Sequence, residues 1–426
     1  MKLDLNLGRR SGANVVGLDI QPGFVAAVQA RVNGSILAER AAALPLAGDT
    51  VRDGEVVDEA ALGEVLQELF KSSGLSKRVR VGVANQRTVL RLLELPPVTD
   101  RKELDAAVRF QAQDQVPMPL NNAVLDFHPL GIIDTPAGPR QRVVLVAAQR
   151  DMVERLLSAV RAAGLTAEGI DLSAFALIRS LYRPEPEQAA RVLYLNVDGL
   201  TNLAIAEGPV CRFTRVVGSG LEGIASELAV RRGVPLAEAR ALLADIDLTA
   251  PAAEQGPGAP EPAPAEPADE AEADRDSREQ SATEDEPSSA LGESEPVSPA
   301  RHEEHETGMS YEELAAVPAP EPEAPPEPQS VTDVIEVLEN GIREISGEVR
   351  NSLDFHRSQE GGGEVSHVVL SGAAEAIPGF AEALQASLAV EVRGAAVGLA
   401  DKSLSGKVST HRLAVAAGLA AAEAPQ

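Results

Sequence analysis

The segment VLYLNVDGLTNLAIAEG, residues 192–208, predicts two antiparallel strands joined by a tight polar turn. Apolar residues alternate along both arms, and Asp198-Gly199 lies between them. An earlier segment, VVGLDIQPGFVAAVQA at residues 15–30, repeats the pattern with Asp19 beside a glycine-bearing turn. Two such hairpins far apart in one chain predict two half-domains that face each other across a cleft. Backbone N–H groups of glycine turns can bind phosphate, so the pattern indicates a nucleotide site in this cleft.

The charge of the chain is concentrated in one segment. The 426 residues carry a net charge of −27, which argues against a nucleic-acid partner. Residues 251–330 contain 22 acidic residues, 3 basic residues and 15 prolines. Because so few apolar residues cannot offset the chain entropy lost on folding, we expect residues 247–330 to form a long disordered acidic loop.

The chain contains one cysteine and no long apolar run. Cys211 lies in a strand pattern, which favours a buried structural thiol over a nucleophile, and a single cysteine fits a reducing cytoplasm. No run approaches the roughly 18 apolar residues that a membrane span needs. We therefore expect any membrane role to depend on a partner.

Periodicity, capping residues and prolines predict the order of elements. Strands are expected in the hairpin at 15–34 and at 79–84, 89–95, 143–148, 210–217, 368–371 and 390–392. Helices are expected at 58–72, 99–115, 151–163, 235–243, 331–354, 378–388 and 411–422.

Three local motifs have plainer explanations than the chemistry they suggest. Residues 218–223, GSGLEG, match the glycine pattern of a dinucleotide site, but Val234-Pro235 begins another helix where a second strand should stand. A glycine-bearing strand-to-helix turn is the better interpretation. The sequence HEEH at 302–305 and the sequence YEEL at 311–314 lie in the acidic segment, where a solvated charge run and an unbound spacer are favoured over a metal site and a docking motif.

A third stretch, VVLSG at 368–372, completes a resemblance. Two hairpins and a strand that ends in small residues resemble the actin, Hsp70 and sugar-kinase ATPases. The block at 81–130, with LPP at 95–97, RFQA at 109–112 and VPMP at 116–119, resembles the type IV pilus assembly protein PilM family.

The resemblance implies an α/β, bilobed actin-like (ribonuclease-H-like) ATPase fold with an inserted small α/β 1C subdomain. The expected parts are a tail at 1–13, subdomain 1A at 14–78, subdomain 1C at 79–160, a return to 1A at 161–185, subdomain 2A with the start of 2B at 191–246, the acidic insert at 247–330, a 2B helix at 331–360 and a return to 2A at 361–426.

The family also implies a place and a partner. Its members are cytoplasmic scaffolds of the pilus inner-membrane platform, held at the inner face of the cell membrane by other platform components. They bind the cytoplasmic N-terminal peptide of a PilN-like membrane protein in a groove between subdomains 1A and 1C. From the family's region, we expect that groove to be formed by Val83, Asn85 and Arg87 on a 1C strand, with Phe110 and Gln113 on the following helix.

The family can carry ATP and Mg²⁺ in the cleft. The matching positions are Asp19, Gln21, Gly23, Asn196, Asp198, Gly199, Thr201, Asn202, Ser371, Gly372 and Ala373, with Asp19 and Asp198 as metal ligands. Several of these depart from the family pattern. Pro22 has no N–H to donate to phosphate, Gln21 adds a side chain where glycine would let the backbone approach, and Gly199 stands one place late.

We therefore expect weak or lost ATP binding and no catalytic residue. The alternative is an active ATP-hydrolysing protein with Asp19 or Asp198 as catalytic acid, such as an FtsA-like division scaffold or a secretion-system platform component. A division scaffold normally requires a C-terminal amphipathic membrane helix, which residues 420–426 do not supply.

Residues 1–10, MKLDLNLGRR, alternate strictly, with Leu3, Leu5 and Leu7 on one face. The pattern predicts either a frayed tail or a short strand able to add to a sheet edge. The segment also resembles the N-terminal peptide of PilN, so it could occupy a groove of its own chain or of a neighbouring subunit.

Overall fold

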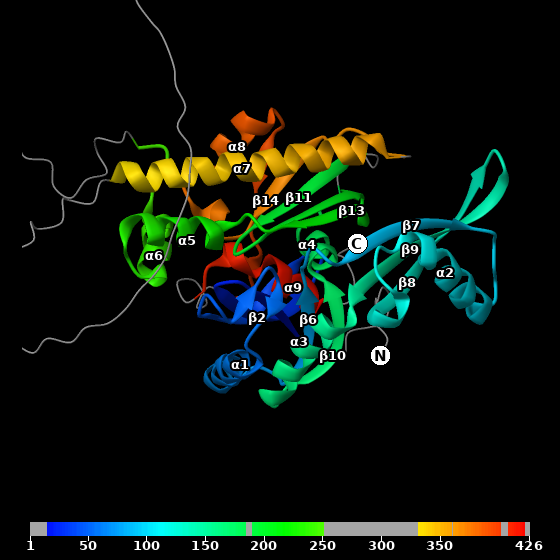
Figure 1. Cartoon of the computed structure of the whole chain (residues 1–426), viewed down its shortest axis with the longest axis horizontal. Helices are drawn as coiled ribbons and strands as arrows, with labels where there is room; N and C mark the ends of the chain where they lie inside the picture. Colours follow the sequence, from blue (N-terminus) through cyan, green and yellow to red (C-terminus); the bar gives the residue numbers. More distant parts are fainter. Residues whose placement is uncertain (1–14, 185–189, 251–330, 360, 402–407, 422–426) are drawn as a thin grey trace, which may run out of the picture. The chain divides into compact units, whose positions relative to one another are not determined.

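Two sheets organise the chain, and each contains one of the two predicted hairpins (Figure 1). The computed structural model describes residues 15–184, 190–250, 331–359, 361–401 and 408–421. The first sheet has six strands in the order β10-β6-β1-β2-β3-β16. Its strands are β1 (Val16–Gln21), β2 (Phe24–Val32), β3 (Ile36–Pro45), β6 (Arg78–Val83), β10 (Thr166–Leu172) and β16 (Gly398–Leu399).

The second sheet has five strands in the order β13-β12-β11-β14-β15. Its strands are β11 (Arg191–Val197), β12 (Thr201–Glu207), β13 (Val210–Val217), β14 (His367–Ser371) and β15 (Val392–Gly394). β11 is antiparallel to β12 and parallel to β14, so the turn after β11 and the end of β14 lie at the same edge of the sheet. The predicted hairpin and the third predicted stretch therefore meet there.

Two wholly buried helices, α4 (Ser173–Leu181) and α9 (Ala414–Ala420), pack between the sheets. A Cβ on Gly418 would lie 1.9 Å from the carbonyl oxygen of Ala176, so only glycine permits this close approach. Arg179 donates to the carbonyl oxygen of Gly418 at 2.7 Å, and Arg80 donates to that of Leu419 at 2.8 Å. These bonds satisfy carbonyl groups that the end of a helix leaves unpaired. The expected helix at 411–422 is instead a 3₁₀ turn, η4 (Thr410–Leu413), followed by α9.

The remaining large helices cover the outer faces of the sheets. The first sheet carries α1 (Glu59–Ser73) and α3 (Arg150–Ala162), and the second carries α5 (Leu221–Arg232), α6 (Leu236–Asp245), α7 (Val331–Ser358) and α8 (Phe380–Leu388). Asp58 caps α1 by accepting from the N–H of Ala61 at 2.9 Å. Since α6 follows α5 with no strand between them, the GSGLEG motif forms the predicted strand-to-helix turn and no dinucleotide-binding unit.

A separate three-stranded sheet, in the order β7-β9-β8, packs against α2 (Arg101–Gln115). Its strands are β7 (Val89–Leu95), β8 (Ala123–Thr135) and β9 (Gly138–Gln149). The expected limits of this subdomain, 79–160, are wrong at both ends. β6 pairs with β1 and β10 in the first sheet, and α3 packs against α1. The alternating valines of β6 would suit a strand of either sheet, so the sequence could not decide between them.

Some expectations fall outside the described residues. These are the tail at 1–13, most of the acidic insert and the motifs within it. Among the helices that the structure describes, none is long and apolar enough to cross a membrane.

Candidate functional site

The turns of the two hairpins meet directly. Gly23 follows Pro22 in the β1–β2 turn and has a φ of 87°, a value that favours glycine. A Cβ on Gly199, in the β11–β12 turn, would lie 2.1 Å from the carbonyl oxygen of Pro22. The two backbones are therefore in contact at the position where the sequence predicts phosphate between them.

Asp19 lies buried behind the first turn. The side-chain amide of Gln21 is 3.3 Å from each oxygen of its carboxyl group. Burial, and after it the negative charge of Asp198, raise the pKa of Asp19 to about 7, although the bond from Gln21 opposes the rise. The side chain of Gln21 thus donates to a carboxyl group of its own strand.

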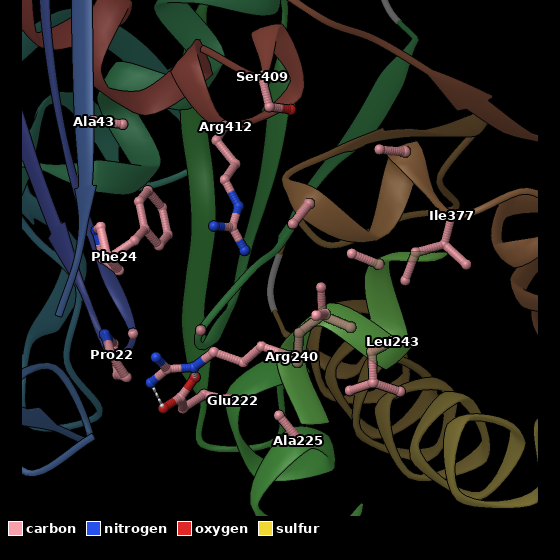
Figure 2. Close-up of a pocket in the computed structure, with 18 of the residues that line it drawn as sticks. Pro22, Phe24, Ala43, Glu222, Ala225, Arg240, Leu243, Ile377, Ser409 and Arg412 are labelled. Carbon is pink, nitrogen blue, oxygen red and sulfur yellow. Dashed lines mark hydrogen bonds and ion pairs between the residues drawn. The ribbon is translucent and has the colours of Figure 1, made fainter. Parts of the chain in front are cut away.

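Asp198, in the second turn, is paired with a residue that the sequence did not predict. Its carboxylate lies 3.1 Å from Nε of Arg412 and accepts from the backbone N–H of Ala373 at 3.2 Å. Burial raises the pKa of Asp198 to about 6, while Arg412 and the backbone donors oppose the rise. The same guanidinium lies 4.5 Å above the ring of Phe24 in the first sheet (Figure 2). No motif marked Arg412, because only the tertiary fold brings η4 to the hairpin turns.

The other predicted polar residues of the cleft are engaged by the protein or buried. Thr201 donates its hydroxyl to the carbonyl oxygen of Ser219 at 2.6 Å, and Ser371 donates to that of His411 at 3.4 Å. Asn196 and Asn202 are buried, and neither side-chain polar atom of Asn202 has a hydrogen-bond partner in the described part of the chain.

A cavity of about 500 Å³ lies beside the turns (Figure 2). Of the eleven predicted nucleotide residues, only Gly23, Gly199 and Ala373 line it. Its walls are largely apolar, with Phe24, Leu44, Ala225, Leu243 and Ile377 among them.

An ion pair closes one side of this cavity. Arg240 lies 2.8 Å from Oε2 of Glu222, and it donates to the carbonyl oxygen of Leu46 at 3.2 Å. Arg240 belongs to α6 and Leu46 follows β3, so this contact joins the two sides of the cleft. Together with the pair between Arg412 and Asp198, it neutralises the charges around the cavity.

A groove of about 420 Å³ lies between the short hairpin β4 (Val51–Arg52) and β5 (Glu55–Val56) and the loop that follows β6. Asn85 is buried there and donates to the carbonyl oxygen of Asp53 at 2.6 Å, while its own oxygen accepts from the N–H of Arg87 at 2.7 Å. The Asn85 side chain thereby fixes the loop against the hairpin.

Arginines line this groove. Arg87 lies 3.1 Å from Glu55 and donates to the side chain of Gln149 at 2.7 Å. Arg52 and Arg155 also line the groove, and neither has an ion pair within the described residues. The groove therefore presents arginine donors beside a rigid loop.

Of the five predicted partner residues, Asn85 and Arg87 line this groove, and the other three do not. Val83 is buried in the core at the end of β6, a strand of the first sheet, and Asn85 and Arg87 lie in the loop that follows. The expected 1C strand is therefore wrong for these three residues. Phe110 is 71% exposed and Gln113 is exposed on α2.

Neither a metal cluster nor a reactive thiol stands out. Among the described residues, no group of three or more His, Cys, Asp or Glu side chains could hold a metal ion. Cys211 is buried, as predicted, and burial raises the pKa of its thiol to about 12.

Two hairpin-based sheets packed through a shared helical layer, with a cleft where their turns meet, define an actin-like protein. The sequence profile of the family described as "Type IV pilus assembly protein PilM" matches residues 17–220. This match confirms the predicted resemblance to the PilM family.

Comparison with solved structures agrees on the fold. The chain is 19% identical to a chain of the "PilM-PilN type IV pilus biogenesis complex", with 96% of this chain and 97% of that chain covered and a TM-score of 0.64. It is also similar to the ethanolamine utilization protein EutJ from Carboxydothermus hydrogenoformans, at 13% identity, 95% and 88% coverage and a TM-score of 0.45. MreB 5 of Spiroplasma citri bound to AMPPNP follows at 11% identity, 95% and 94% coverage and a TM-score of 0.43. The last two are too distant to inform the site.

Proposed function

We propose that this chain is a scaffold of the type IV pilus assembly platform that binds the N-terminal peptide of a PilN-like inner-membrane protein. The match to the PilM family profile and the likeness to a chain of a PilM-PilN complex support the assignment. The proposal places the chain in the cytoplasm, at the inner face of the membrane through that partner. The observation that carries it is the groove held open by Asn85, with Arg87 on its wall.

The groove suits an extended peptide. Because Asn85 fixes the loop after β6 to the β4–β5 hairpin, the walls are ordered before the peptide arrives and little entropy is lost on binding. Arg52, Arg87 and Arg155 offer side-chain donors to the backbone carbonyl groups and acidic side chains of a peptide.

We also infer that the cleft does not bind Mg-ATP. A triphosphate between the hairpin turns would require the backbones of Pro22 and Gly199 to separate. Arg412 already supplies the positive charge next to Asp198 that a metal ion would bring. The residues present therefore do not fit a nucleotide with its magnesium.

The peptide proposal is tested by fluorescence anisotropy with a labelled N-terminal PilN peptide and the full chain. Arg87→Glu should weaken binding at least tenfold, since it places a carboxylate beside Glu55 and in the groove. Arg78→Glu is the matched control, because Arg78 is an exposed arginine of the same sheet that pairs with Glu168 outside the groove. If the unmodified chain does not bind the peptide, the proposed partner is refuted. If both variants bind it equally, the proposed binding groove is refuted.

The cleft is tested by isothermal titration with Mg-ATP. Heats of binding that fit a micromolar dissociation constant would refute the inference that the cleft does not bind Mg-ATP. Hydrolysis of ATP in the presence of magnesium would favour the alternative of an active ATPase.

A further inference from the structure

A second groove, of about 840 Å³, lies where two sheet edges face each other. One edge is β7, which pairs only with β9 among the described strands, and the other is β13, which pairs only with β12. Residues of both strands line the groove, and α7 forms its third wall. Two edges with unpaired backbone groups are a template for an added strand, and proteins usually cover such edges.

The wall beside β13 is apolar and partly exposed. The rings of Phe213 and Phe355 lie 5.9 Å apart, and Phe355 is 55% exposed. Val216 also lines the groove, as do Glu344 and Glu348 of α7, which are engaged by Ser219 and Arg215 within the groove. The groove therefore suits an extended segment with apolar residues on one face.

The chain contains a segment of this chemistry outside the described residues. In residues 1–10, MKLDLNLGRR, strict alternation would place Leu3, Leu5 and Leu7 on one face of an extended segment. A single strand is not stable without an edge to pair with. The leucine face matches the aromatic wall.

The segment is also long enough to reach the groove. Val16 is paired with Val79, and Gln86, which lines the groove, comes seven residues after Val79. Seven residues span at most about 24 Å and the paired strands lie about 5 Å apart, so Gln86 is within about 29 Å of Val16. The nine steps from Leu7 to Val16 span up to about 31 Å when extended. Residues 1–7 can therefore reach the groove of their own chain.

We propose that residues 1–7 bind in this groove of the same chain as an added strand along the edge of β13. Gln86 also lines the proposed partner groove, so the added strand lies next to the partner peptide. The docking itself does not depend on the proposed function.

Cross-linking tests the docking. In the full chain, Leu5→Cys combined with Phe355→Cys should give an intramolecular product with a short bis-maleimide. Leu5→Cys with Val230→Cys is the control, because Val230 is 85% exposed on α5 and lies outside the groove. Cys211 is buried and should not react. A product only between two copies would overturn binding within the chain, and a yield no greater than the control would overturn the docking.

Hydrogen exchange gives a second test that needs no added cysteine. Leu3→Asp with Leu5→Asp should speed exchange of the β13 edge amides at least tenfold, whereas Asp4→Asn with Asn6→Asp alters only the opposite face and should leave it unchanged. Equal exchange in both variants would overturn the proposal.

Discussion

The pair between Asp198 and Arg412 should contribute to stability in a pH-dependent way. The Asp198 side chain is 1% exposed and that of Arg412 is 36% exposed. Removal of one partner from a fully buried pair costs about 3–5 kcal/mol, and the partial exposure of Arg412 reduces this to about 2 kcal/mol. Loss of the contact with the Phe24 ring adds about 1 kcal/mol. Arg412→Gln should therefore lower the free energy of unfolding by about 3 kcal/mol at pH 8.

The sign of the pH dependence follows from the pKa of Asp198. Its folded value of about 6 lies above the ordinary 3.8, and loss of Arg412 should raise it further. At pH 5 the carboxyl group is largely protonated with or without Arg412, so the ion-pair part of the loss disappears and about 1 kcal/mol remains. The cost of Arg412→Gln should therefore grow as the pH rises through about 6.

Urea unfolding followed by circular dichroism, at pH 5 and pH 8, measures this difference. A double-mutant cycle with Asp198→Asn should give a coupling of about 2 kcal/mol at pH 8. Arg393→Gln is the matched control, since it breaks an exposed pair with Glu391 and should cost less than about 0.5 kcal/mol. Equal costs of Arg412→Gln at the two pH values, or a coupling below about 0.5 kcal/mol, would refute the argument.

Three further perturbations test other parts of the structure. Asp19→Asn removes a carboxyl group whose pKa is raised from 3.8 to about 7. The loss of stability between pH 5 and pH 8, measured by urea unfolding, should therefore be smaller by about 2–3 kcal/mol in the variant. An unchanged loss would contradict the argument that burial raises this pKa. Gly199→Ala should lower the thermal midpoint by several degrees because its Cβ meets Pro22, whereas Gly223→Ala, at a helical position with nothing near the added Cβ, should not. Deletion of residues 1–10 should change the affinity for a PilN-like peptide several-fold in anisotropy, and an unchanged affinity would show that the tail does not affect that groove.

The parts of the fold that depend on local sequence could be predicted. The two hairpins alternate apolar residues around turn residues, and both form as expected. Assignment of β6 to a sheet failed, because its valines satisfy any buried strand and only pairing with β1 and β10 decides. Arg412 could not be predicted for the same reason, since its partners lie on β2 and in the β11–β12 turn.

Only some of the residues predicted to form the partner groove line a groove in the structure. Asn85 and Arg87 were chosen from the region that the family uses, and both line a groove. Phe110 comes from the same family region, but the apolar side of α2 that packs on the small sheet consists of Leu104, Val108 and Ala112, which leaves Phe110 on the exposed side. Spacing fixes which residues share a face and leaves open what that face meets.

The contacts across the cleft bear on how such a scaffold would work. A nucleotide-driven change would have to part the turns at Pro22 and Gly199, break the bond from Arg240 to Leu46 and remove Arg412 from between Asp198 and Phe24. These three sets of contacts involve different residues, so breaking one leaves the others in place. With the cleft closed as proposed, partner binding in the groove at Asn85 should not respond to added ATP.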